Sequence, residues 1–539
     1  MKSIRLLLFL VIFGITCCCS QKQKKDYSWD ELSSMYKVPE WFTQARFGIW
    51  VHWGPQSVPE YGGGWYERHM YMQNVGNQTF GENAYPYHVK TFGPQCKLGY
   101  KDVIHAWKAE KLNTDSLLRY FTEDLGAKYF MAQAHHHDNF DNWNSTYQPW
   151  NSVNVGPKID VIGEFSKSAK KYGVPFGVST HDERFFTWDL PAFGSDTSGI
   201  YKGVPYDARL TKADGKGKWW EGLDPADLYG IPPEKRTPEW EEEWKKNWQK
   251  RVEEVLTKYD VDFMWFDGRG FPYGDYGKEV FRYFYNYKLD KNGKINAFIA
   301  GKIPGEKAIV HDVERGVESK IYKDPWESIS TFTHWFYKKD MESRHNTRSI
   351  IELLVDVVSK NGNYMLNVEL LPDGTIPAEH KAILDRFGTW MKLNGEAIYD
   401  SKPWKVHGDN LFSCLENINY NKKTVADHEA IDKAKAKAKK SIQFNNRDKY
   451  SPAYGHNEVR YTTKGNVLYV IVLNPEEGEI ELPSLGLNSI YKPGKIYSAE
   501  LIGSSENIKF DQNGERFRLN VPAKRPNKYS AVIRVKGAI

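Results

Sequence analysis

Short apolar runs alternate with longer amphipathic stretches along residues 41–404. A short apolar run bounded by polar residues is typical of a strand that is buried on both faces. The runs predict strands at 47–52, 129–134, 176–180, 263–267, 308–313 and 364–368. Between them, stretches such as 161–172 and 239–259 have the apolar spacing of helices. This alternation predicts an α/β fold, a (β/α)8-type (TIM-like) barrel with insertions, over residues 27–405.

The pattern changes after about residue 400. Runs at 466–473, 479–482 and 530–535 are strand-like and are separated by Gly, Pro and Asn turns. They predict a C-terminal antiparallel β-sandwich over residues 406–539. Residues 428–440 include strictly alternating Lys and Ala, a pattern without an apolar stripe. We interpret this segment as a solvated insertion, and a patch that binds an acidic polysaccharide is the alternative.

The first residues are typical of an export signal. Lys2 and Arg5 precede an apolar core at 6–15, which is too short to span a bilayer stably. The cysteines at 17–19 follow directly and resemble a bacterial lipoprotein cleavage site. Residues 1–19 are therefore predicted to be a signal peptide, and the protein to be a periplasmic protein or an outer-membrane lipoprotein. A plain secretory signal with incidental cysteines is the alternative. The only membrane contact expected is this N-terminal lipid anchor.

Composition narrows the class of protein. The formal charge of +5 is a small excess of 74 Lys and Arg over 69 Asp and Glu, which argues against a dedicated nucleic-acid binder. Such a balance still tolerates a polyanionic substrate. Nineteen Trp residues and an aromatic fraction of 15% suit sugar stacking as well as an aromatic core. The five Cys residues have neither a disulfide framework nor metal-ligand spacing.

Two apolar runs lead into carboxylates where a barrel strand should open into a loop. Asp267 follows Trp265-Phe266, and Glu314 follows Asp312-Val313. Active sites of such barrels are built at the carboxyl ends of the strands. A pair of carboxylates from neighbouring strand ends is what glycoside hydrolysis needs, one as nucleophile and one as proton donor. The sequence therefore predicts a glycosidase.

The residues from 35 to 405 resemble glycoside hydrolase family 29, the α-L-fucosidases, in sequence order. The similar segments are Ala45-Arg46-Phe47-Gly48-Ile49-Trp50-Val51-His52-Trp53-Gly54, His136-His137-Asp138-Asn139-Phe140, Trp265-Phe266-Asp267, Ser359-Lys360-Asn361-Gly362-Asn363, Pro372-Asp373-Gly374-Thr375-Ile376-Pro377 and Asn394-Gly395-Glu396-Ala397-Ile398-Tyr399. The resemblance implies an exo-acting, retaining glycosidase that removes terminal α-L-fucosyl residues from an oligosaccharide or polysaccharide.

The resemblance also implies catalytic roles. Asp267 would attack the anomeric carbon, and Glu314 would protonate the leaving oxygen and later activate water. In a retaining enzyme the two carboxyls lie about 5–5.5 Å apart. Asp312, Glu318 and Glu327 compete with Glu314 for the acid role, because each is a carboxylate in the same part of the chain.

Histidine and tryptophan side chains are expected to hold the sugar. By family likeness, imidazoles contact its hydroxyls and indoles wall the subsite; these residues are His52, His136, His137, His181, Trp50, Trp65, Trp265 and Trp335. A zinc site in the run 135–138 is the competing interpretation. Alternation along a strand would send residues 135 and 137 to one face and 136 to the other, so the run cannot chelate as a block. No metal and no cofactor are predicted.

The chain departs from the family at three positions. Gly64 stands where many members have a Glu that binds the sugar, which removes a charged contact and is expected to open space. His334 stands where a smaller residue is common, and Asn142 replaces an apolar one. These changes leave L-galactose, which is L-fucose with a C6 hydroxyl, as an alternative sugar from an algal galactan. A different class, an inactive glycan-binding surface protein, is disfavoured because both carboxylates are present.

Overall fold

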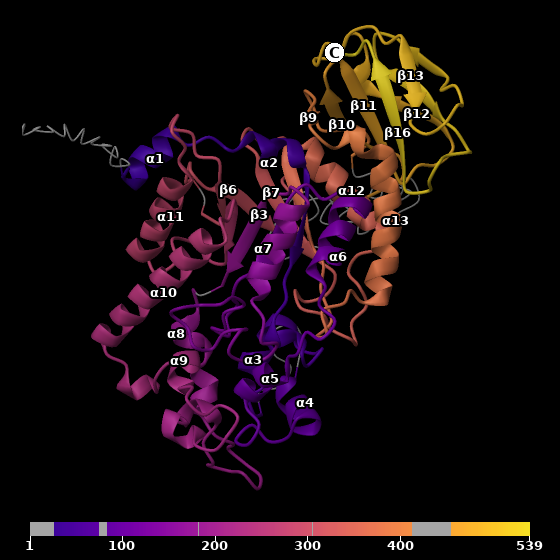
Figure 1. Cartoon of the computed structure of the whole chain (residues 1–539). Helices are drawn as coiled ribbons and strands as arrows, with labels where there is room; N and C mark the ends of the chain where they lie inside the picture. Colours follow the sequence, from indigo (N-terminus) through magenta and orange to yellow (C-terminus); the bar gives the residue numbers. More distant parts are fainter. Residues whose placement is uncertain (1–25, 75–82, 182, 304, 412–453) are drawn as a thin grey trace, which may run out of the picture.

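The computed structural model describes residues 26–74, 83–181, 183–303, 305–411 and 454–539. Its helices are α1 (Trp29–Met35), α2 (Glu40–Ala45), α3 (Tyr66–His69), α4 (Ala84–Thr91), α5 (Tyr100–Ala106), α6 (Thr114–Arg119), α7 (Val161–Lys171), α8 (Phe185–Trp188), α9 (Pro225–Tyr229), α10 (Pro238–Lys258), α11 (Asp275–Lys288), α12 (Thr347–Ser359) and α13 (Ala378–Asn394). Figure 1 shows them around a central barrel.

Parallel strands form a closed barrel in sequence order. They are β1 (Phe47–Val51), β2 (Phe130–Gln133), β3 (Phe176–Thr180), β4 (Phe263–Phe266), β5 (Phe298–Gly301), β6 (Val310–Glu314), β7 (Trp326–Thr331) and β8 (Gly362–Asn367). The pairing of Phe47 with Tyr364 is part of the β1–β8 register that closes the barrel. The predicted fold class is thus confirmed, and each of the predicted barrel strands coincides with an observed one. β5 and β7 were not predicted.

Local capping explains where the predicted helices begin. The side chain of Asp160 accepts a hydrogen bond from Gly163 N at the start of α7, and Thr237 does the same for Trp240 N at the start of α10. Such N-caps satisfy backbone N–H groups that have no partner inside the helix. Both helices begin and end within one residue of the predicted ranges.

The interior of the barrel is filled by large side chains. A single buried cluster consists of Phe42, Ala45, Trp50, Tyr129, Met131, Phe263, Trp265, Phe298, Ala300, Val310, Ile329 and Met365. Phe42 and Ala45 belong to α2, so this helix contributes to the same cluster as the strands. Two of the tryptophans predicted to contact sugar, Trp50 and Trp265, are therefore also barrel core.

The C-terminal residues form two antiparallel sheets. One has the order β13 (Ser498–Leu501), β16 (Ser530–Lys536), β11 (Val467–Leu473), β10 (Glu458–Lys464), β9 (Lys402–Pro403), and the other β12 (Gly478–Leu482), β15 (Phe517–Val521), β14 (Phe510–Gln512). They share a buried core, as the sandwich prediction requires. The insertion predicted at 428–440 lies outside the described residues.

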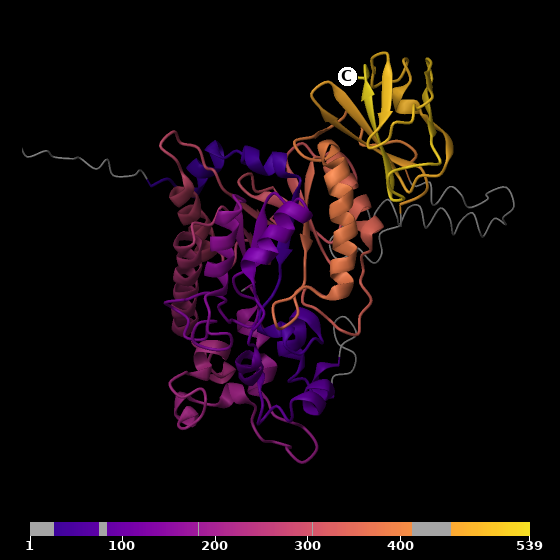
Figure 2. The ribbon, with the colours of Figure 1, turned by 45° about the vertical axis from the view of Figure 1, so that its right-hand side comes forward.

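The C-terminal sheets lie at one end of the barrel, away from the long connections that follow β1 and β3. Figures 1 and 2 show α3–α5 and α8–α9 gathered at the opposite end. Buried polar contacts join the sheets to the outer helices: Arg460 of β10 bonds to Asp356 of α12, and Trp390 of α13 donates to Ser530 Oγ. In the described part of the chain, no helix combines the length and apolar character needed to cross a bilayer.

Candidate active site

A cavity of about 410 Å³ opens at the carboxyl ends of the barrel strands. Its lining consists of Trp50, His52, Gly64, Trp65, His136, His137, His181, Glu183, Arg184, Trp265, Asp267, Gly268, Arg269, Lys302, Glu314 and Trp335. Every catalytic and sugar-binding residue predicted from the sequence is in this set. The structure therefore brings all ten together, from β1, the segment before α3, and the ends of β2, β3, β4, β6 and β7.

The two predicted catalytic carboxylates are joined by a lysine. Lys302 Nζ lies 2.9 Å from Asp267 Oδ1 and 2.7 Å from Glu314 Oε2, and donates to both. These two oxygens are therefore no farther apart than the sum of the two distances. The side chains are largely enclosed, with exposed fractions of 19% for Asp267, 12% for Glu314 and 11% for Lys302.

The surrounding charges keep Asp267 ionised. Burial raises the pKa of its carboxyl, but the Lys302 ammonium and the neighbouring His137 and His181 outweigh this and hold the pKa well below its usual range. Burial likewise lowers the pKa of Lys302, while the carboxylates of Glu314 and Asp267 raise it above its usual value. At neutral pH the cavity thus holds the Asp267 carboxylate next to the Lys302 ammonium.

The competing acids lie outside the cavity. Asp312 and Glu327 are side by side in the register of β6 and β7 and are buried, with Tyr129 donating to Glu327 Oε1 at 2.8 Å. Burial raises the pKa of both, to about 7 for Asp312 and about 8 for Glu327. Glu318 contacts His311 Nε2 at 3.0 Å. Of these acids only Glu314 lines the cavity with Asp267, so the geometry favours it as proton donor.

The predicted histidines come from three neighbouring strand ends. His52 follows β1, His136 and His137 follow β2, and His181 follows β3. His137 Nε2 lies 3.6 Å from Asp267 Oδ2. Residues 135–137 lie beyond the end of β2, so strand alternation does not orient them: His136 and His137 line the cavity, whereas His135 approaches Asp141 at 3.5 Å. His135 thus lies outside the cavity lining and His136 and His137 within it, which differs from the expected alternation.

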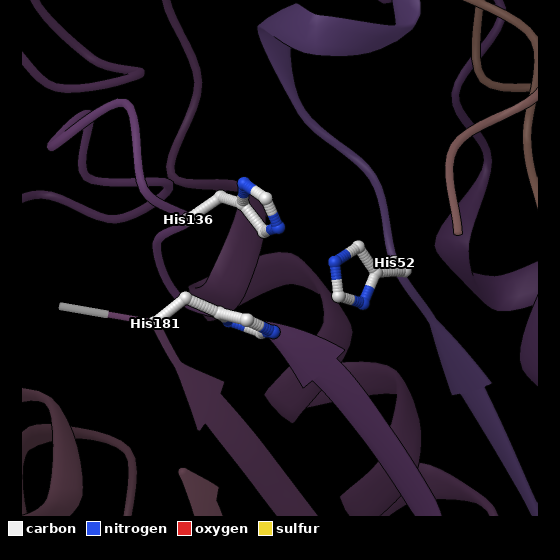
Figure 3. Close-up of side chains that lie close together, drawn as sticks. All are labelled: His52, His136 and His181. Carbon is white, nitrogen blue, oxygen red and sulfur yellow. The ribbon is translucent and has the colours of Figure 1, made fainter. Parts of the chain in front are cut away.

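One group of histidines has the spacing of metal ligands. His52, His136 and His181 each place a ring nitrogen within 4.8 Å of the others. Figure 3 shows the three rings turned toward a common space. Burial is the main cause that lowers the pKa of each ring, to about 3 for His181 and well below the usual value for the other two. All three are therefore neutral at neutral pH, a state that suits sugar hydroxyls and metal ions alike.

Aromatic rings form a continuous wall. The Trp50 ring packs in a tilted arrangement against Trp265 and Trp335, with ring centres 5.0 and 5.5 Å away. Trp65 lies apart from them, under the guanidinium of Arg184 at 5.4 Å. Trp50 and Trp265 are buried, whereas Trp65 and Trp335 are half-buried. The wall offers apolar faces of the kind on which sugar rings stack.

The departures from the family have structural consequences. Gly63 has a φ of +58°, and a Cβ there would lie 2.6 Å from His334 Cβ. A Cβ on Gly64 would lie 3.0 Å from the His136 ring, so the missing side chain leaves less room at this point than the sequence suggested. Asn142 donates to Trp53 O and Gln133 O, both at 3.0 Å, and so joins the ends of β1 and β2.

Several lining residues were missed by sequence reasoning. Lys302 follows β5 directly, and recognition of that strand would have placed it at the active-site rim. Arg269 follows Asp267 closely, and Glu183 and Arg184 follow His181 in the chain; all three are exposed at the mouth of the cavity. Their only sequence signal is proximity to a strand end.

A closed parallel barrel with a carboxylate pair in an enclosed cavity at its carboxyl end defines a barrel-type glycoside hydrolase. A family model described as α-L-fucosidase matches residues 14–396. The tissue α-L-fucosidase of Bos taurus is 25% identical over 541 residues, covering 96% of this chain and 92% of the relative. That of Rattus norvegicus is 27% identical over 393 residues, covering 71% and 74%. A solved α-fucosidase from Thermotoga maritima superposes with a TM-score of 0.65 at 25% identity, covering 94% and 99%. The chain belongs to the α-L-fucosidase family.

Proposed function

We propose that this glycoside hydrolase removes terminal α-L-fucosyl residues from glycans by retaining double displacement. The observation that carries the mechanism is the shared lysine between Asp267 and Glu314. Because Lys302 Nζ lies 2.9 Å from Asp267 Oδ1 and 2.7 Å from Glu314 Oε2, these two oxygens are no farther apart than the sum of the two distances. Inverting enzymes need about 6.5–9.5 Å between carboxyls to admit a water molecule, whereas retaining enzymes need about 5–5.5 Å.

In the proposed reaction, Asp267 attacks the anomeric carbon while Glu314 donates its proton to the glycosidic oxygen. The covalent glycosyl-enzyme is then hydrolysed by water that Glu314 deprotonates. The imidazoles of His52, His136 and His181 would bind hydroxyls of a sugar held against the tryptophan wall. A cavity enclosed by loops on the barrel rim suits a single terminal residue, which supports exo action.

Product stereochemistry tests the mechanism. With an aryl α-L-fucoside, the first product seen by NMR should be the α-anomer. Asp267→Ala should lower kcat at least about 10³-fold, and added azide should restore turnover as the β-L-fucosyl azide. Asp262→Ala, directly before the start of β4 and outside the cavity lining, serves as the control. A β-anomer as first product, or near-normal activity of Asp267→Ala, would refute the proposal.

An α-L-galactosidase activity is the second candidate. The observation that favours it is the ammonium of Lys302, 5.1 Å from the centre of the Trp265 ring. If the C6 side of the sugar packs on this wall, a polar group lies close enough to meet a C6 hydroxyl. Side-by-side kcat/KM values on aryl α-L-fucoside and aryl α-L-galactoside decide between the two sugars.

We also propose that the enzyme is exported and lipid-anchored. The support is the N-terminal sequence alone, in which Cys17, Cys18 and Cys19 follow an apolar core. Metabolic labelling with palmitate should mark the wild-type chain, and replacement of all three cysteines by Ser should abolish the label.

A further inference from the structure

The three-histidine cluster at the floor of the cavity has features that sugar binding alone does not require. We infer that His52, His136 and His181 form a site for one late first-row divalent metal ion, such as Zn²⁺, which competes with the sugar. The inhibitory part of this inference rests on the proposed function, whereas the binding part does not.

The ligand set is suitable in number and kind. Three imidazoles with one open position is the arrangement in which His₃ zinc sites keep a water molecule or a substrate. The ring centres form a near-equilateral triangle, with sides of 5.0 Å (His52–His136), 4.8 Å (His52–His181) and 4.5 Å (His136–His181). Zn–N bonds of about 2.0–2.1 Å require only small side-chain rotations from this starting point.

The His52 ring needs a partner. His52 is 2% exposed, and neither of its ring nitrogens has a hydrogen-bond partner among the described residues. A buried polar atom without a partner is unfavourable, so the site favours a ligand that supplies one. Sugar hydroxyls and a metal ion both do so.

The other two rings are held from behind, as metal-binding imidazoles usually are. His181 Nδ1 contacts the carbonyl oxygen of His135 at 3.3 Å, which directs its other nitrogen forward. Gln56 Nε2 lies 2.7 Å from His136 Nδ1. Turning the Gln56 amide over exchanges its oxygen and nitrogen, so that Gln56 Oε1 accepts from His136 Nδ1–H. The Nε2 atom of His136 is then free to bind a metal. Gln56 Oε1 has no partner within the described chain in the present orientation.

One nearby carboxylate favours a cation at this cluster, whereas burial, the largest influence on each ring, disfavours one. The negative charge of Asp267 acts on both His52 and His181 in the direction that stabilises positive charge there. Neutral imidazoles need lose no proton when the ion binds. Neutral nitrogen ligands suit Zn²⁺, Cu²⁺ and Ni²⁺ better than Mg²⁺ or Ca²⁺.

The test is calorimetric titration of the full chain with ZnCl₂, with Cys17, Cys18 and Cys19 replaced by Ser in every sample because thiolates also bind Zn²⁺. We expect one ion per chain. His52→Ala and His181→Ala should weaken binding at least about a hundredfold. His137→Gln, a change in the same cavity but outside the cluster, should keep it. Co²⁺ titration of the Cys→Ser chain with its histidines intact should give the visible absorption of a tetrahedral Co²⁺ site. This readout needs no histidine variant.

Kinetics separate this inference from the proposed function. Zn²⁺ should raise KM for aryl α-L-fucoside without lowering kcat, and EDTA should reverse the effect. If the enzyme hydrolyses the substrate but binds no Zn²⁺, the inference fails alone. If it binds Zn²⁺ but hydrolyses no α-L-fucoside, the proposed function fails alone. Unchanged affinity in both His→Ala variants overturns the metal site.

Discussion

Lys302 is the cation between the two proposed catalytic carboxylates. Its ammonium donates to Asp267 and Glu314 and lies over the Trp265 ring. This arrangement favours the ionised form of Asp267, the proposed nucleophile. The same two hydrogen bonds hold the Asp267 and Glu314 side chains in place relative to each other. Lys302 is therefore a positioning residue as well as a source of charge.

Replacing Lys302 should change the pH profile. Lys302→Met removes the cation that lowers the pKa of Asp267, so that pKa rises and the acid limb of kcat/KM moves to higher pH. Loss of one buried charge at the reacting centre should also lower kcat/KM about a hundredfold near neutrality. Lys302→Arg should retain the acid limb, and Lys307→Met, at an exposed position nearby, should behave as wild type. An acid limb that does not move in Lys302→Met contradicts this role.

Glu314 should be needed most by poor leaving groups. Glu314→Ala is expected to lower kcat about 10²–10⁴-fold on a fucosylated oligosaccharide, and much less on an aryl fucoside whose leaving group needs little protonation. Glu318→Ala should leave the ratio of the two rates unchanged, because that carboxylate contacts His311 outside the cavity. Equal losses on both substrates would assign the acid role elsewhere.

The site could be predicted largely from strand ends. Residues such as Asp267 and His181 follow parallel strands, and parallel strands bring their carboxyl ends to one rim. Their roles remain predictions, although their convergence in one cavity is observed. Arg184 and Arg269 could not be placed in this way, because they lie in loops whose path depends on tertiary contacts.

The connection after β2 is fixed by a buried ion pair from α10. Arg251 Nε lies 3.2 Å from Asp141 Oδ2, and its Nη1 lies 2.6 Å from Asn139 Oδ1. Both members of the ion pair are buried, with side-chain exposures of 1% and 0%. Since His136 and His137 begin this connection, α10 positions two of the predicted sugar ligands from outside the barrel.

Breaking that pair should loosen the site as well as the fold. Arg251→Met leaves the Asp141 carboxylate buried without its guanidinium, which should lower the free energy of unfolding by about 3–5 kcal/mol. KM should rise more than kcat falls, because the chemistry at Asp267 is untouched. Lys250→Met, an exposed change on the same helix, is the control for urea unfolding and kinetics. Stability equal to that control would contradict the argument.

The two strands that the sequence pattern missed differ in character. β5 (Phe298–Gly301) is apolar and buried, as the equally short β2 and β4 are, so neither length nor polarity explains why it was missed. β7 contains Glu327, Ser328 and Ser330, which are buried with partners or neighbours inside the barrel rather than exposed. Hydropathy records side-chain polarity, whereas burial in a closed barrel depends on neighbours distant in sequence.

At the scale of the molecule, buried charges join the barrel to the C-terminal sheets. Asp356 of α12 bonds to Lys360 Nζ at 2.7 Å and to Arg460 Nε of β10 at 2.6 Å. Burial raises the pKa of Asp356, but these two cations outweigh it and keep the pKa below the usual value. The sheets therefore pack on the barrel through a fixed polar contact rather than through a flexible tether.

Removing the shared carboxylate should destabilise both parts. Asp356→Ala leaves the buried Lys360 ammonium without its carboxylate and Arg460 with Glu458 alone, and should lower the free energy of unfolding by about 3 kcal/mol or more. Asp385→Ala, which breaks a half-exposed pair with Lys381, should cost less than about 1 kcal/mol. Thermal unfolding followed by tryptophan fluorescence measures the difference. Equal effects in the two variants would mean that the junction contributes little.

Trp50 and Trp265 belong both to the packed barrel interior and to the cavity lining. This limits how the sugar preference of the enzyme can change. A substitution on that wall disturbs the packing of the strands together with the fit of the sugar, so few such changes preserve a folded protein. The glycine run at 62–64 and His334 lie outside this buried cluster. New sugar preferences in descendants of this sequence should therefore arise by changes in those loops, while Trp50 and Trp265 of the aromatic wall are retained.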